Sequence, residues 1–271
     1  MGTVHMFMHS KGGVGKTTLC YMITQYLQDK NIPFFSYDCD PNNKTLSSYK
    51  GLPVQYLELT HPDSNRVNER SFDALMEAIF KMPENAHMLV DVGSNTYDTL
   101  LDYMMGQNIP EVIAEQTGHN MCLHSIITGS DFERSVQTLG HLISRVMTHS
   151  NCKTIVWLNA FNGAVIDKKN NKTFEDTKIF KDNIDRIHEI ALFPQMKGDT
   201  FLRDFQDVLI GRKLTFAEAE KDEALHTMVR IRVGKMRKDI YQELERINVF
   251  DISAQELVPE LVESGKKSSK K

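Results

Sequence analysis

The sequence predicts an α/β fold in which a mostly parallel, twisted sheet is flanked by helices on both faces. Short apolar runs alternate along the chain with segments whose apolar residues recur every three or four positions, which are the patterns of strands and of amphipathic helices. A glycine-rich stretch follows the first apolar run, and the next two runs end on aspartates. Because strands that alternate with helices favour parallel pairing, both faces of the sheet are expected to be covered.

The elements of this sheet are expected before residue 194. Apolar runs predict strands at 4–8, 33–37, 87–92, 121–128, 153–158 and 189–193. Apolar stripes predict amphipathic helices at 19–27, 72–80 and 132–146, and a further helix is expected at 174–186. One α/β domain therefore accounts for this part of the chain.

The chain beyond residue 194 is expected to be helical. Apolar stripes at 201–209 and 225–247 predict additional C-terminal helices that pack on the same sheet. The last residues read GKKSSKK, a like-charged composition that buries too little surface to order itself. We predict one domain over 1–250 and a mostly flexible tail over 251–271.

Composition limits the classes of function. The net charge of −4 argues against a surface that binds nucleic acid or membrane by charge alone. The four cysteines are scattered without the spacing of a metal site, which favours free thiols in a reducing compartment. Because no apolar run approaches the ~18 residues of a membrane span, we expect a cytoplasmic protein without membrane insertion.

The strongest motif is the sequence SKGGVGKTT at residues 10–18. Its glycines let backbone N–H groups turn toward phosphate oxygens, its second lysine supplies a cation, and the following helix adds its positive end. This is a P-loop, the phosphate-binding loop of an NTPase fold, and it predicts binding of ATP with Mg²⁺ held by the Thr17 hydroxyl. The strict pattern has glycine where Ser10 stands, and Lys11 is an additional lysine. The predicted nucleotide-binding residues of the loop are Lys11, Gly12, Gly13, Val14, Gly15, Lys16, Thr17 and Thr18.

Aspartates at the ends of the second and third strands form the second motif. In a parallel sheet, carboxylates at strand ends point into the ligand crevice. In the stretch DCDPNN, Asp40 is predicted to orient the attacking water, and Asp38 to organise the water shell of the metal. The alternative is a simple Asp-Pro turn. Asp91 ends the strand HMLVDV, where a carboxylate that binds Mg²⁺ is expected, and residues 93–95 would form a switch loop. The predicted metal set is Thr17, Asp38, Asp40 and Asp91.

Two further residues are candidates for the nucleotide base. Asn159 ends the strand TIVWLN, where its amide would pair with the edge of a purine, and Pro194 would shape the other wall of that pocket. The alternatives are a turn or cap for Asn159 and an ordinary loop proline for Pro194.

KGGVGKTT with its leading lysine, followed by DCDPNN and LVDVGS, resembles the deviant Walker family of ATPases that includes the ParA and MinD proteins. The resemblance implies an ATP-dependent homodimer in which Lys11 reaches the nucleotide of the partner subunit, and it implies catalytic roles for Lys11, Lys16 and Asp40. Within that family, the stretches AEQTGHNMCLHSIITG and WLNAFNG are similar to the TraL/StbB group of plasmid transfer and stability proteins, although residues 17–19 depart from that group's KSF-like version. This closer resemblance implies a role in conjugative transfer or plasmid segregation, with a protein partner.

Three other functions compete with this one. A general partition or positioning ATPase outside a plasmid context is the alternative of the same kind. A metal-handling or reductase component would need paired cysteines, and a membrane-bound switch would need a basic C-terminal helix where residues 251–263 are acidic. The scattered histidines His119, His124, His141 and His149 are expected to be structural.

Direct DNA binding has one candidate surface, a group of cations on the last long helix. The alternative, which we favour, is a solvated helix face, because acidic residues are interleaved with the cations. The candidate group is Arg230, Arg232, Lys235, Arg237 and Lys238.

Overall fold

The computed structural model describes residues 1–61, 63–64, 66–146, 149, 151–161, 163–193, 198–247 and 250. Pro194 and the predicted tail at 251–271 lie outside the described residues. Among the described residues, no helix combines the length and the hydrophobicity that crossing a bilayer requires.

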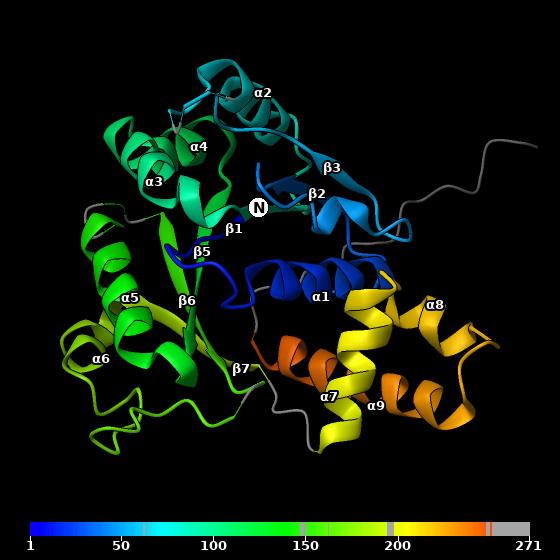
Figure 1. Ribbon diagram of the computed structural model, residues 1–271. Coiled ribbons are helices and arrows are strands. Elements are labelled where there is room, and N and C mark those ends of the chain that lie inside the picture. The colour runs from blue at the N-terminus through cyan, green and yellow to red at the C-terminus, as the bar shows by residue number, and fades with distance from the viewer. Residues whose placement is uncertain are drawn as a thin grey trace, which may run out of the picture.

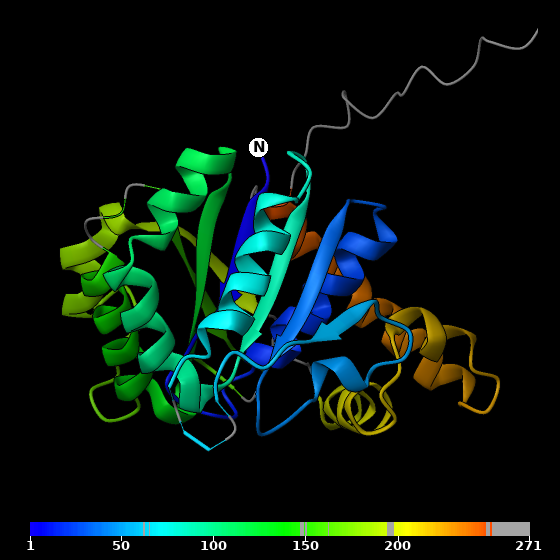
Figure 2. The same ribbon diagram turned by 90° about the horizontal axis from the view of Figure 1, so that it is seen from above.

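A seven-stranded sheet forms the centre of the molecule, and its strand order is β3-β2-β4-β1-β5-β6-β7. Every neighbouring pair of strands is parallel, as the sequence predicted. The sheet twists between two layers of helices (Figures 1 and 2). The strands are β1 Thr3–Phe7, β2 Phe34–Cys39, β3 Val54–Tyr56, β4 His87–Val92, β5 Asn120–Thr128, β6 Cys152–Asn159 and β7 Ile187–Phe193.

The helices divide between the two faces of the sheet. Hydrophobic contacts assign α1, α7, α8 and α9 to one face and α2–α6 to the other. Figure 1 shows the yellow and orange C-terminal helices gathered on the side of α1. The helices are α1 Lys16–Asp29, α2 Glu69–Phe80, α3 Tyr97–Gly106, α4 Ile109–Thr117, α5 Phe132–Val146, α6 Lys178–Asn183, α7 Asp199–Asp204, α8 Phe216–Lys221 and α9 Thr227–Arg246.

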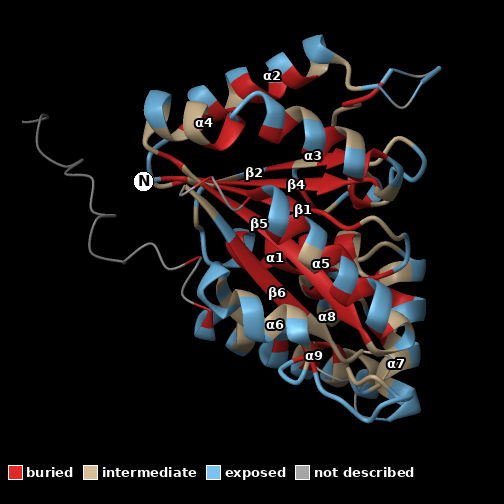
Figure 3. Ribbon diagram, turned by 90° about the vertical axis from the view of Figure 1, so that its left-hand side faces the viewer, coloured by how far each residue is buried: buried red, intermediate tan, exposed pale blue. Residues whose placement is uncertain are grey.

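The core lies on both sides of the central strands. Along β1, Val4 and Met6 belong to the cluster under α2–α4, whereas Phe7 belongs to the cluster under α1 and α9. All of β4 is buried, and Figure 3 shows the strands as buried ribbons beneath helices with exposed outer faces. Burial on both faces explains why these strands read as continuous apolar runs rather than as alternating ones.

The structure corrects several details of the sequence prediction. The helix expected at 174–186 is shorter, because Phe174 is fully buried in a turn and Thr177 caps a helix that begins at Lys178. The stripe at 201–209 changes from the α-helix α7 to a π-helical segment, η5, at Phe205–Gly211. The prediction also missed β3, α3 and α4.

Side chains of α9 cover the free edge of β7. The Arg246 guanidinium donates to the Ile190 carbonyl at 2.6 Å, and a Glu243 carboxylate oxygen accepts from the Leu192 N–H at 2.6 Å. These bonds satisfy backbone groups that would otherwise offer an edge for pairing with another chain. The last long helix therefore packs against the edge of the sheet.

A chain of buried histidines crosses the face of the sheet that α1 covers. The Trp157 indole donates to His124 Nδ1 at 2.9 Å, His124 Nε2 lies 3.0 Å from His5 Nδ1, and His5 Nε2 lies 2.9 Å from His87 Nδ1. Because an indole N–H is only a donor, each neutral histidine in turn accepts at Nδ1 and donates from Nε2. The ring of Phe250 stacks on His5 and also lies against His87, the last histidine of this hydrogen-bonded series.

This hydrogen-bond order also bears on a possible metal site. Ligand atoms of His5, Cys122 and His124 lie within 4.8 Å of one another. The nitrogen of His124 that faces His5 carries a proton, however, and burial raises the pKa of the Cys122 thiol. Neither group is in the deprotonated form that a metal needs. The structure thus supports the expected structural role of His124, while His5 and His87 were not singled out by the sequence.

Acid should destabilise the fold through these histidines. Burial lowers the pKa of His87 to about 4 and that of His124 to about 3. A depressed histidine pKa means that the unfolded chain binds protons first, so this stability is present above pH 6.5 and is lost as the pH falls toward 4. We expect protonation of His87 alone to lower the free energy of unfolding by about 3 kcal/mol between pH 7 and pH 4, as measured by urea denaturation.

The matched variant is His87→Asn, whose amide oxygen accepts from His5 but does not titrate over this range. Its unfolding free energy should fall less steeply between pH 6.5 and pH 4 than that of the parent. Equal slopes in the two proteins would contradict the assignment.

Candidate functional site

The glycine loop turns tightly between β1 and α1. Gly13 and Gly15 have φ angles of +75° and +107°, a region that other residues rarely adopt. The Asn159 amide donates to the Val14 carbonyl at 2.9 Å and so holds the loop against the end of β6. The first turn of α1 has no acidic residue and no capping side chain, so its N–H groups are available for an anion.

Lys16 lies inside this loop. Its side chain is buried, and its ammonium donates to the Lys11 carbonyl at 3.3 Å, so it is held within the curve of the loop. Burial lowers the pKa of Lys16, while the carboxylates of Asp91 and Asp40 act in the opposite direction. The loop, the end of β4 and the loop after β2 therefore meet at one place.

Asp91 lies at this meeting point, and its carboxylate has an unusual environment. It is 1% exposed, and neither of its carboxylate oxygens has a hydrogen-bond partner among the described residues. Burial raises its pKa to about 7, although the Thr17 hydroxyl and the Lys16 ammonium lower it. A buried carboxylate that makes no well-formed hydrogen bond is costly unless a cation or a better-placed donor arrives. The residues thus fit a hard cation such as Mg²⁺, which prefers oxygen ligands.

Asp38 and Asp40 have different environments in the loop after β2. One carboxylate oxygen of Asp38 accepts from both the N–H and the hydroxyl of Ser47 at 2.9 Å, and the other accepts from the Asp40 N–H at 3.2 Å. Asp38 is buried and shapes the loop. Asp40 is partly exposed and accepts from the N–H groups of Asn42 and Asn43.

Gly93 brings the loop after β4 against Asp40. A Cβ atom at Gly93 would lie 3.0 Å from Asp40 Oδ1, and a Cβ atom at Gly12 would lie 3.5 Å from the Ser94 hydroxyl. The segment predicted as a switch loop begins with Gly93 and continues as a short 3₁₀-helix at Ser94–Thr96. It therefore packs between the glycine loop and Asp40.

Lys11 forms an ion pair within its own chain. Its ammonium lies 2.6 Å from Asp131 Oδ2, and both side chains are partly exposed. Asp131 ends the 3₁₀ turn Gly129–Asp131 that follows β5. Asp131 was not predicted from the sequence, although it stands just beyond the end of a strand, as Asp40 does.

The prediction that Asn159 contacts the nucleotide base stays a prediction. Both ends of the Asn159 amide already bond the chain, because its oxygen accepts from the Phe161 N–H at 3.0 Å while its nitrogen holds Val14. Its evident role in the structure is to support the glycine loop.

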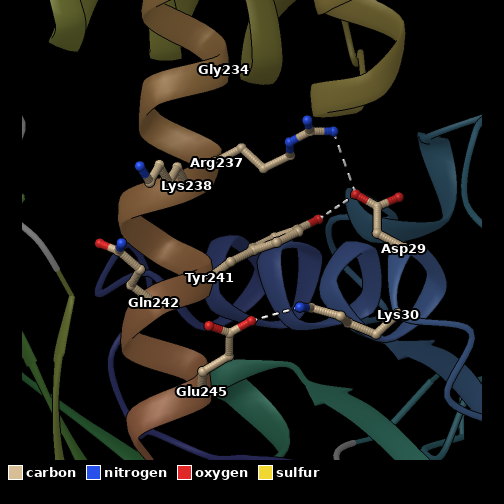
Figure 4. A pocket seen from close by; sticks show the side chains of 8 residues that line it. All are labelled: Asp29, Lys30, Gly234, Arg237, Lys238, Tyr241, Gln242 and Glu245. Carbon is tan, nitrogen blue, oxygen red and sulfur yellow. Dashed lines mark hydrogen bonds and ion pairs between the residues drawn. The ribbon is translucent and has the colours of Figure 1, made fainter.

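The cations of α9 do not form one free patch. Arg237 pairs with Glu220 and approaches Asp29, to which Tyr241 also donates (Figure 4). Arg232 pairs with Asp204. The remaining members differ in their contacts: Arg230 donates to Thr227, Lys235 lies over the Phe201 ring, and Lys238 is exposed. These ion pairs favour the alternative of a solvated helix face.

A parallel sheet with a glycine loop after its first strand, and with a buried acid on the neighbouring strand, defines a P-loop nucleotide-binding protein. Residues 5–268 match the model of the CobQ/CobB/MinD/ParA nucleotide binding domain. The chain belongs to this family.

Within the family, the chain is related to TraL. Two proteins of Escherichia coli described as Protein TraL are each 32% identical to it over 251 residues, which cover 92% of this chain and 100% of theirs. This supports the resemblance to the TraL group that the motifs suggested.

Two solved structures show limited similarity to the chain. MinD in the MinC:MinD cell division complex of Aquifex aeolicus is 14% identical, with a TM-score of 0.49 and coverage of 88% of this chain and 96% of that one. A putative plasmid partition protein of Borrelia burgdorferi bound to AMPPNP is 12% identical, with a TM-score of 0.43 and coverage of 91% and 99%.

Asp91 and Asp38 should respond in opposite ways to the same substitution. They are register partners on adjacent strands, but among the described residues Asp91 makes no well-formed hydrogen bond, whereas Asp38 accepts three. We expect Asp91→Asn to raise the unfolding free energy by roughly 1–3 kcal/mol, because it removes an uncompensated buried charge. Asp38→Asn should lower it by roughly 1–3 kcal/mol, because an amide cannot accept all three bonds.

The effect of Asp91→Asn on the unfolding free energy should depend on pH. Since the pKa of Asp91 is raised to about 7, the parent loses stability as the pH rises through 7. The gain from Asp91→Asn should be largest near pH 8 and small near pH 4, as measured by chemical denaturation. An Asp91→Asn protein less stable than the parent at pH 8 would contradict this interpretation.

Proposed function

We propose that this protein is an ATP-driven molecular switch, a slow ATPase that dimerises when it binds ATP and acts in plasmid transfer or segregation. The observation that carries the proposal is the convergence of the glycine loop, the Lys16 ammonium and the unpartnered Asp91 carboxylate at the carboxyl ends of parallel strands. Membership in a nucleotide-binding family that includes ParA and MinD supports it.

The residues have separable roles in this proposal. The N–H groups of the loop and Lys16 bind the phosphates, and Thr17 and Asp91 hold Mg²⁺, with Asp38 fixing the loop that carries Asp40. When bound, Mg²⁺ neutralises negative charge that develops on the phosphates. Asp40 orients water for attack on the terminal phosphate, because its partly exposed carboxylate lies beside Gly93 and near Lys16.

Lys11 connects the nucleotide site to dimerisation. In the monomer its charge is satisfied by Asp131. We propose that ATP draws a second copy of the chain onto this face, where Lys11 leaves Asp131 for the nucleotide of the partner subunit. An ion pair that is partly exposed is weak enough to exchange partners in this way.

The proposed cellular role follows from the TraL relatives and from the motifs that resemble the TraL/StbB group. In this role the protein acts in the cytoplasm and its nucleotide state controls binding to a protein partner. A general partition ATPase remains the alternative of the same kind.

The switch should be visible as a change in oligomeric state. Light scattering coupled to size exclusion should show a monomer without nucleotide and a dimer with ATP and Mg²⁺. Lys16→Ala should abolish the dimer, because it removes the buried cation of the phosphate site, and Asp40→Ala should trap it, because hydrolysis stops. Lys81→Ala, an exposed lysine paired with Glu77 on α2, is the control and should behave as the parent. A parent that stays monomeric with ATP would refute the switch, though not ATP binding.

Asp131 should oppose dimerisation. Asp131→Ala frees Lys11, so the ATP-dependent dimer should form at a several-fold lower protein concentration than in the parent, as measured by analytical ultracentrifugation. Asp102→Ala breaks a surface ion pair with Arg145 on neighbouring helices and serves as the control. If Asp131→Ala leaves the dimerisation constant unchanged or weakens it, Asp131 does not hold Lys11 back.

A further inference from the structure

A small cavity lies beside the glycine loop, on the side of β5 and β6. Its lining includes Gly13 of the loop, Ser130 after β5, Asn159 at the end of β6, and Lys168 from the long loop that follows β6. The cavity measures about 90 Å³, which exceeds the roughly 30 Å³ occupied by one water molecule. It therefore admits a small polar group next to the phosphate-binding loop.

The segment that carries Lys168 is packed closely against the sheet. A Cβ atom at Gly129 would lie 2.1 Å from the Ala164 carbonyl oxygen, so only glycine permits this approach of the loop to the end of β5. Further along, Phe174 is fully buried in the cluster under α5. Both ends of the loop are thus anchored.

The tip of the loop has its own hydrogen bonds. Asp167 and Lys172 exchange backbone hydrogen bonds of 2.8 Å and 3.3 Å, and the Asp167 carboxylate accepts from the N–H groups of Lys169 and Asn170. These bonds close a tight turn that includes Lys168. The position of Lys168 at the cavity is therefore set by the backbone of the loop.

Lys168 differs in charge from everything else that lines the cavity. The other lining residues are glycines, Ala164, Asn159 and the hydroxyl residues Thr128 and Ser130. Within the described part of the chain, its ammonium has no hydrogen bond or ion pair. An exposed, uncompensated cation at the rim of a polar cavity attracts an anionic group.

We propose that Lys168 is a phosphate-binding residue, whose ammonium contacts the phosphate chain of the nucleotide held by the glycine loop. It adds a third lysine, from a distant part of the sequence, to Lys16 and Lys11. Because Gly13 and Lys168 line the same cavity of one chain, the contact is made within the subunit. The inference rests on the proposed binding of ATP.

The test compares Lys168→Ala with Lys169→Ala. Both variants remove one exposed lysine from the same turn, but only Lys168 lines the cavity. The dissociation constants for ATP, ADP and adenosine are measured by titration calorimetry at two salt concentrations, and thermal unfolding checks that both variants fold as the parent does.

Lys168→Ala should weaken ATP binding roughly tenfold and reduce its salt dependence, because one charge-assisted contact is lost. Lys169→Ala should match the parent, Lys168→Arg should restore most of the affinity, and adenosine binding should not change. If the parent binds ATP and the two alanine variants have equal affinities, the inference fails alone. If the parent does not bind ATP, the proposed function fails and the inference falls with it.

Discussion

The carboxylate of Asp91 is fully buried at the end of β4 with no well-formed hydrogen bond among the described residues, although the Thr17 hydroxyl and the Lys16 ammonium lie near it, and the arrangement of the candidate site follows from what that charge requires. A charge in this position is costly in the free protein, as its raised pKa of about 7 reflects. The fold places Lys16 near it and leaves the α1 N-terminus uncapped, so positive potential surrounds the space in front of the carboxylate. A metal–phosphate complex would satisfy all of these groups at once.

Asp38 and Asp91 are register partners, but they have different roles in the structure. Asp38 sits at the same level on β2, yet its three hydrogen bonds turn it into a support for the loop. Asp91 makes no well-formed hydrogen bond with the described residues. Two identical side chains on adjacent strands thus contribute stability in one case and binding capacity in the other. Proteins commonly give up stability at functional sites in this way.

Much of the fold and of the glycine loop was predictable because the signals are local. The loop residues are contiguous, and the strands carry continuous apolar runs that reflect burial on both faces. The helices α3 and α4 were missed, although Leu100, Leu101, Met104 and Met105 form a helical stripe in α3. Helix α4 carries Pro110 in its first turn, and proline is more typical of loops than of helix interiors. The resemblance to the ParA and MinD family, carried by these local motifs, agrees with the family match.

Contacts between distant segments were not predictable in the same way. Lys11 and Asp131 are 120 positions apart, and only the parallel pairing of β1 with β5 brings their loops together. The histidine chain joins four strands, and its members stand at unrelated intervals in the sequence. The division of roles between Asp38 and Asp91 depends likewise on Ser47, whose contribution no spacing indicated.

The measurement that tests the central claim most directly is the effect of Mg²⁺ on nucleotide affinity. Titration calorimetry of the unaltered protein should show ATP binding that is clearly tighter with Mg²⁺ than with a chelator present, because the cation satisfies the buried carboxylate at the same time as the phosphates. Equal affinities with and without Mg²⁺, or no ATP binding at all, would contradict the account.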